Sequence, residues 1–191
     1  MKKQFFLSAL LLIFATSDFA QNKTIDSLKL ALKLAKHDTM RSNILAQLAE
    51  IADDGEWEKY NELLKVLTEA KLKLTNPNGT EYKLYQKHFA ISLHNIGFIY
   101  KNQGDINKAL EYYDKSMKIQ EEIGDKEEIA ITYHNIGAIY NKQGHISKAL
   151  EYYGKSLKIK EEINDKDGIA SSFNAIGIVY KNQGDTDKAL E

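Results

Sequence analysis

The chain of 191 residues contains no cysteine and only one proline. Without cysteine it cannot form a disulfide framework, carry a lipid-anchored N-terminal cysteine or use a thiolate nucleophile. Because proline is nearly absent while Leu, Ala, Lys, Glu, Ile and Tyr are abundant, helix is favoured almost throughout. The composition therefore predicts an all-α protein that is held together by packing alone.

An excess of charge of either sign is also missing, because 26 basic residues stand against 27 acidic ones and the formal net charge is -1. Proteins that bind nucleic acid need clustered Lys and Arg to displace counterions, so we expect no nucleic-acid partner. Opposite charges instead lie four residues apart, as in Glu111 and Lys115 or Glu151 and Lys155. This is the spacing of neighbours on a solvated helix face.

Signatures of catalysis are lacking as well. The sequence has no Gly-rich phosphate loop and no HExxH motif, and its acidic residues lie at helix-surface spacing rather than as an isolated pair. His94 and His134 occupy equivalent positions, but we expect neighbouring helices to hold them about 10 Å apart, too far to share one ion. We therefore predict no enzyme activity, no cofactor and no metal site.

A long apolar run occurs only near the N-terminus, where FFLSALLLIFA (5–15) follows the basic start MKKQ and precedes the polar TSDFAQ. This layout is typical of a secretory signal peptide. The run is too short for a membrane span, which needs about 20 apolar residues. We expect cleavage after Ala20, or alternatively after Ser17, and export to a bacterial periplasm or to the medium.

A repeat is the main feature of the sequence. HNIGFIYKNQGDINKALEYY (94–113) and HNIGAIYNKQGHISKALEYY (134–153) are identical at 15 of 20 positions. NAIGIVYKNQGDTDKALE (174–191) matches the first copy at 12 of 18 positions, and the three copies are 40 residues apart. A fixed period of this size is the signature of a stacked repeat array.

Apolar spacing predicts three helices before the repeats, and the turn-rich segment TNPNG (75–79) ends this part of the chain. The three predicted helices cover residues 24–37, 38–54 and 55–74.

Each repeat then divides into two helices, A and B. In the first repeat, helix A covers residues 80–102, Gly104 is a left-handed stop, and Asp105 caps a helix B that ends near Ile123. In the later repeats, the predicted caps are Asp125 and Asp165, and the predicted stops are Gly144 and Gly184. Gly154 is an exception, because it lies inside a predicted helix B.

These repeats resemble the tetratricopeptide repeat, which has a small residue and an aromatic on helix A, and an alanine and an aromatic on helix B. The matching residues are Gly97, Tyr100, Ala109, Tyr113, Gly137, Tyr140, Ala149, Tyr153, Gly177, Tyr180 and Ala189. Glycine and alanine let the two helices approach closely, while the tyrosines fill the space between successive pairs. The resemblance implies a right-handed superhelical solenoid of antiparallel helix pairs.

The period of 40 residues exceeds the family's usual period of about 34. Long repeats of this kind resemble those of kinesin light chains and of bacterial signalling proteins. We expect three parts: a signal peptide (1–20), N-terminal helices with a degenerate capping repeat (21–79), and an array of two full repeats and a third cut short (80–191). Helix A of the third repeat would keep an uncovered apolar stripe, so we expect self-association or fraying at that end.

In tetratricopeptide arrays helix A lines a concave groove, where asparagines hold the backbone of an extended peptide. The resemblance implies this role for Asn95 and Asn135, although the third copy has Ala175 there. A carboxylate clamp is not expected, because it needs Lys and Asn at His94 and Phe98. The residues expected to face or rim the groove are His94, Asn95, Phe98, Lys101, Asn102, His134, Asn135, Ala138, Asn141, Lys142, Asn174, Ile178, Lys181 and Asn182.

These features lead to two hypotheses about function. The first is an exported binding module without catalysis of its own, whose groove takes a partner protein or an extended peptide. The alternative is the extracytoplasmic sensor region of a longer bacterial signalling protein, such as a histidine kinase with tetratricopeptide repeats. The sequence that follows Glu191 in the gene would separate them.

Overall fold

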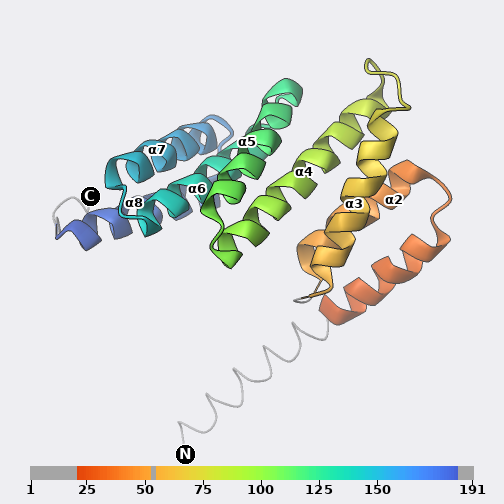
Figure 1. Cartoon of the computed structure of the whole chain (residues 1–191), viewed down its shortest axis with the longest axis horizontal. Helices are drawn as coiled ribbons and strands as arrows, with labels where there is room; N and C mark the ends of the chain where they lie inside the picture. Colours follow the sequence, from red (N-terminus) through yellow and green to blue (C-terminus); the bar gives the residue numbers. More distant parts are fainter. Residues whose placement is uncertain (1–20, 53–54, 185–191) are drawn as a thin grey trace, which may run out of the picture. The chain divides into compact units, whose positions relative to one another are not determined.

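The computed structural model describes residues 21–52 and 55–184, and within these ranges the secondary structure is helical, with no strand (Figure 1). The predicted all-α class is confirmed. A first helix covers residues 21–34. The helices that follow are α2 (Asp38–Ile51), α3 (Trp57–Leu72), α4 (Thr80–Gln103), α5 (Ile106–Ile123), α6 (Lys126–Lys142), α7 (Ile146–Glu162) and α8 (Lys166–Gln183).

Several predictions concern segments outside the described residues. They are the signal peptide at 1–20, the seven residues 185–191, and with them the packing role of Ala189. Within the described part of the chain, no helix combines the length and the apolar character that a membrane crossing requires.

The chain divides into two compact units, residues 1–88 and 89–191, and the division falls inside α4. In the first unit, the helix over residues 21–34 packs with α2 and α3 around a shared apolar core. Lys71 on α3 forms an ion pair with Asp38, the first residue of α2. The buried core residues of this unit are Ile25, Ile44, Leu45, Leu48, Ala49, Tyr60 and Leu64.

The second unit consists of helix pairs that follow the predicted A and B division (Figure 1). Within each pair a glycine of helix A lies directly against a buried tyrosine of helix B. A Cβ atom on Gly97 would lie 2.8 Å from a ring carbon of Tyr113, and one on Gly137 would lie 2.8 Å from the same atom of Tyr153. These glycines are therefore required for the close approach of the two helices, since any side chain would enter the tyrosine ring.

Apolar clusters join one helix pair to the next. Ala109 and Tyr113 on α5 are fully buried and pack with Ile136 and Ile139 on α6. A second cluster repeats this arrangement one repeat later along the chain, and its buried residues are Ala149, Tyr153 and Val179. Helix α6 thus contributes to the core of its own pair and to that of the preceding one.

The turns between helices follow the predicted pattern, with two exceptions. Gly104, Gly144 and Gly184 have φ angles of 83°, 76° and 80°, which confirms the left-handed stops. Asp105, Asp125 and Asp165 accept a hydrogen bond from the backbone three residues later and so cap α5, α6 and α8. The exceptions are in the second repeat: His145 precedes α7 without a side-chain cap, and Asn164 has a φ of 56° where the first repeat has Gly124.

Candidate functional site

Helices α4, α6 and α8, the A helices of successive repeats, lie next to one another. Side-chain hydrogen bonds join α4 to α6, and α6 is in contact with α8. Positions 94, 95, 98, 101 and 102 of α4, with their equivalents 40 and 80 residues later, fall on one side of these helices. We call this surface the A-helix face.

The A-helix face carries polar and apolar groups at repeating positions. Phe98 and Ile178 occupy equivalent positions and are 38% and 51% exposed, whereas Ala138 between them is half-buried. Asn95, Asn135, Lys101, Asn141 and His134 are half-buried, and Asn102, Lys142, Asn174, Lys181 and Asn182 are exposed. The face therefore offers amide, ammonium and apolar groups to a partner that runs across the three helices.

Among the positions that define this face, His94 is the buried one, since it is 9% exposed. Its Nδ1 is 3.0 Å from Thr132 Oγ1, and its Nε2 is 3.1 Å from Asn135 Nδ2. The amide nitrogen of Asn135 can only donate a hydrogen bond. Nε2 of His94 therefore accepts from Asn135, and Nδ1 of His94 donates to Thr132. His94 is thus the central residue of the junction between α4 and α6.

A chain of buried hydrogen bonds continues from Thr132. The Thr132 hydroxyl donates to Gln120 Oε1 at 3.1 Å, and Gln120 Nε2 donates to Ser116 Oγ at 2.9 Å. Ser116 in turn donates to the carbonyl of Ala90 at 2.7 Å. Each of these hydrogen bonds pairs a donor with an acceptor, and a buried polar network stabilises a fold when its groups are paired in this way.

The network requires a neutral His94, because protonation of Nε2 would leave two donors facing each other at Asn135. Burial also lowers the pKa of His94 to about 4, and the nearby Lys101 acts in the same direction. Hydrogen bonding and desolvation therefore favour the same protonation state.

The second junction, between α6 and α8, differs at three positions of the network. Lys160, Ser172 and Ala175 replace Gln120, Thr132 and Asn135, while the histidine is retained as His134. The Lys160 Nζ donates to Ser172 Oγ at 3.2 Å, and Ser172 donates to the carbonyl of Gly168 at 3.0 Å. The buried Nδ1 of His134 has no hydrogen-bond partner among the described residues.

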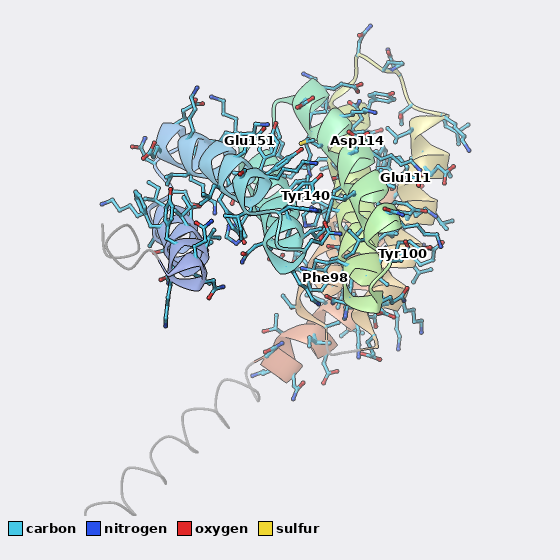
Figure 2. The ribbon with its side chains drawn as sticks, turned by 60° about the vertical axis from the view of Figure 1, so that its left-hand side comes forward. Phe98, Tyr100, Glu111, Asp114, Tyr140 and Glu151 are labelled. Carbon is cyan, nitrogen blue, oxygen red and sulfur yellow. The ribbon has the colours of Figure 1, made fainter. Side chains whose placement is uncertain are left out.

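Charge pairs in the second unit are concentrated on the B helices α5 and α7, which we call the outer helices. Lys115 and Glu111 are 2.6 Å apart on α5, as are Lys155 and Glu151 on α7. Figure 2 labels Glu111, Asp114 and Glu151 on these two helices. These exposed pairs are a solvated face, each of small energetic weight.

Stacked tyrosines repeat beside these ion pairs. Tyr100 stacks on Tyr112 and Tyr140 on Tyr152, each with ring centroids 5.5 Å apart. A lysine lies over each stack, as Lys108 does over Tyr100 at 4.9 Å. The stacks join α4 to α5 and α6 to α7, so Tyr100 and Tyr140 of the repeat pattern are packing residues.

Sequence reasoning missed the residues that connect the predicted ones. Gln120, Thr132 and Ser116 are polar and fully or almost fully buried, yet their spacing along the chain gives no sign that they meet at His94. A comparison of the two junctions position by position would have drawn attention to Lys160. Among the described residues, no cluster of three or more His, Asp or Glu side chains is arranged to hold a metal ion.

Comparisons with known proteins identify the repeat. The tetratricopeptide repeat family matches residues 88–162, whereas no curated protein matches the chain at a significant level. Among solved structures, BtubC (BKLC) from P. vanneervenii aligns with a TM-score of 0.57 at 21% identity, over 93% of this chain and 69% of that chain.

A kinesin light chain-like protein of Podosopora anserina, with nearly identical TPR-like repeats, aligns with a TM-score of 0.52 at 15% identity. The alignment covers 91% of this chain and 84% of that one. At such identities the likeness establishes the fold, which is a helical solenoid. The 40-residue register, the glycine-tyrosine contacts and the family match agree: residues 88–162 carry tetratricopeptide repeats, and the chain has the fold of a tetratricopeptide-like solenoid.

Proposed function

We propose that this chain binds an extended segment of a partner protein along its A-helix face. The tetratricopeptide fold indicates a protein–protein interaction module. The observation that carries the proposal is the recurrence of equivalent polar and apolar side chains on α4, α6 and α8, which are consecutive neighbours. An array of this kind offers contacts at regular intervals to an extended chain.

The chemistry of the face suits a main chain whose own groups are unpaired. An asparagine both donates to a carbonyl and accepts from an amide, so Asn95 and Asn135 can pair with backbone groups. Phe98 and Ile178 add exposed apolar surface on the first and third A helices. Asn135 also donates a hydrogen bond to His94, so it would both bind the partner and hold α6 against α4.

The proposal assigns no reaction to the chain. Tetratricopeptide repeat proteins are generally non-catalytic scaffolds, which supports binding as the whole activity of this region.

We also propose export of the mature protein. This rests on the basic start, the apolar run of residues 5–15 and the polar exit before residue 21. Mass spectrometry of the protein from its own cells should find a mature N-terminus at Gln21, for cleavage after Ala20, or at Asp18, for cleavage after Ser17. A soluble cytoplasmic product that retains Met1 would overturn the localisation.

The binding proposal is tested with a partner captured by crosslinking in the exporting cells. The double substitution Asn95→Ala with Asn135→Ala should weaken binding by about 0.5 to 1.5 kcal/mol for each hydrogen bond lost. Asn107, exposed on α5, provides the matched control, and Asn107→Ala should bind normally.

Circular dichroism of each variant separates loss of binding from loss of folding. Full affinity in a folded double variant, together with lost affinity after a change on α5 or α7, would place the site on the outer helices and overturn the proposal.

A further inference from the structure

The hydrogen bonds that lead to His94 have a direction that is fixed at one end. That end is the carbonyl oxygen of Ala90 on α4, which can only accept, so Ser116 of α5 gives it its one hydroxyl proton at 2.7 Å. The Ser116 oxygen can then only accept from Gln120, 2.9 Å away, which places the Gln120 amide nitrogen toward Ser116 and Oε1 toward Thr132. The orientation of Gln120 therefore follows from a backbone atom.

The same reasoning extends to the A-helix face. Thr132 on α6 gives its proton to Gln120, so its oxygen accepts from Nδ1 of His94. A neutral imidazole with its proton on Nδ1 has a lone pair on Nε2, and the amide nitrogen of Asn135 donates to it at 3.1 Å. We call the side chains of Ser116, Gln120, Thr132, His94 and Asn135 the polar relay.

The polar relay determines what Asn135 presents to a partner. Its amide nitrogen is engaged by His94, and no described residue donates to its Oδ1. Among the described residues, the buried polar atoms that lack a partner belong to His88, Tyr113 and His134, so Oδ1 of Asn135 reaches the surface of this half-buried side chain. Asn135 therefore offers the A-helix face a hydrogen-bond acceptor.

The second junction has no equivalent relay. It begins in the same way, because Ser156 donates to the carbonyl of Ala130 at 2.7 Å. The next residue is Lys160, whose ammonium can only donate, and it donates to Ser172. Position 175 carries an alanine, so α8 has no carboxamide at this place on the A-helix face. The oriented acceptor is thus particular to α6.

We infer from this geometry that His94 is a positioning residue for partner binding: it holds the Asn135 carboxamide with Oδ1 outward, where it accepts a main-chain N–H of the partner segment. The inference rests on the proposed binding along the A-helix face and adds the group that the partner must supply at α6, a hydrogen-bond donor. With the carboxamide turned round, only its amide protons would face outward, and a partner N–H would find no acceptor.

The tautomer of His94 tests the polar relay without a partner. Proton–nitrogen correlation spectra of the mature chain at neutral pH should show the imidazole proton on Nδ1. Thr132→Val keeps the shape of the side chain but removes the acceptor for this proton, so the proton should move to Nε2 and turn the Asn135 carboxamide round. Thr132→Ser retains the hydroxyl and should keep the proton on Nδ1.

Two synthetic peptides test the acceptor. They are acetyl-(Ser-Val)₄-amide and the same peptide methylated on every valine nitrogen, which keeps the carbonyl groups and removes the valine N–H donors. In chemical-shift titrations of the mature chain, the unmethylated peptide should bind about three- to tenfold more tightly, the usual effect of one hydrogen bond. Asn135→Ala should reduce this preference to less than about twofold.

Thr132→Val should reduce the preference as much as Asn135→Ala does, because both act on the same acceptor. The double variant should lose no more than Asn135→Ala alone, since residues that act through one another are not additive. Thr132→Ser should keep the preference, and so should Ser172→Ala, the matched change at the second junction. Circular dichroism checks the fold of each variant. If Thr132→Val does not fold, the tautomer of the parent and the effect of Asn135→Ala still decide the assignment.

The outcomes separate this inference from the proposal on which it rests. Equal binding of both peptides, weakened alike by Asn135→Ala, would keep the A-helix face as the site and overturn the acceptor assignment. A parent imidazole protonated at Nε2, or a folded Thr132→Val chain that keeps the full preference, would overturn the positioning role of His94. No binding of either peptide would overturn main-chain recognition itself, and the inference with it.

Discussion

Single residues determine how closely the helices of this molecule approach. Gly137 on α6 and Gly154 on α7 are both helical glycines, but their surroundings differ completely. A Cβ at Gly137 would lie 2.8 Å from the Tyr153 ring, whereas a Cβ at Gly154 would meet nothing within 4 Å. The addition of a side chain should therefore have opposite effects at the two positions.

Gly137→Leu should destabilise the fold by about 1 to 3 kcal/mol through overpacking against the fully packed Tyr153. Gly154→Ala should stabilise it by up to about 1 kcal/mol, since alanine is the better helix former and has room. Urea unfolding of both variants measures these changes. An unchanged free energy of unfolding for Gly137→Leu would contradict the packing assignment.

Histidine burial makes stability depend on pH. Desolvation lowers the pKa of His88 and of His94 to about 4, below the ordinary 6.5. The unfolded state therefore binds protons more readily than the folded state between these values. The contribution of these two histidines to the free energy of unfolding is fully present above pH 6.5, and it is lost as the pH falls from there toward 4.

For each histidine, we expect the free energy of unfolding to be lower at pH 5 than at pH 7 by on the order of 1 to 2 kcal/mol. Replacement of His94 by Gln should remove its share of this dependence, because glutamine does not titrate. Urea titrations at both pH values test this. An equal loss of stability on acidification in the parent chain and in His94→Gln would show that His94 does not carry the effect.

At the scale of elements, helix ends distinguish the repeats. Three of the four helix starts between α5 and α8 have an aspartate whose side chain accepts from the backbone, and α7 has His145 without such a bond. The backbone before α7 is similar to that before α5, with φ and ψ of -82° and 66° against -81° and 77°. The geometry for a cap is thus already present.

His145→Asp should stabilise the fold by about 1 kcal/mol by capping α7 and placing a negative charge at its N-terminus. The reciprocal change Asp105→His should lower the melting temperature by removing the cap of α5. Thermal unfolding followed by circular dichroism provides both values. A melting temperature for His145→Asp at or below that of the parent would contradict the expected cap.

At the scale of the molecule, the last described helix is the least covered of the array. Phe173 on α8 is 54% exposed, whereas its equivalent Leu93 on α4 is 5% exposed. Helix α6 is packed against α5, α7 and α8, but α8 contacts only α7 and α6 among the described elements. Local opening requires less free energy where fewer apolar contacts are broken.

We therefore expect amide protons of α8 to exchange faster than those of α6, and the chain to self-associate through Phe173 and Ile178 at high concentration. Hydrogen exchange with mass spectrometry and analytical ultracentrifugation measure the two effects. Phe173→Ser should reduce the association. A strictly monomeric chain with slow exchange over residues 170–183 would contradict this.

Fold class and helix boundaries could be predicted from the sequence alone because their causes are local. The apolar spacing, the glycine stops and the aspartate caps act within a few residues of the positions that carry them. The first repeat illustrates this, since Gly104 and Asp105 end and begin helices where predicted. The 40-residue period likewise shows that the helix pairs stack, because neighbouring units must cover each other's apolar surfaces.

The tertiary structure alone decided which polar residues meet between the repeats. Ala90, Gln120 and Thr132 are far apart along the chain, and stacking of α4, α5 and α6 brings them together with His94. The same stacking buries Lys160 of α7, whose ammonium donates to Ser172 of α8. Periodicity determines which face of a helix is buried, but the partner of a buried polar group depends on the rotation and depth of packing. These are set by close contacts such as that of Gly137 with Tyr153.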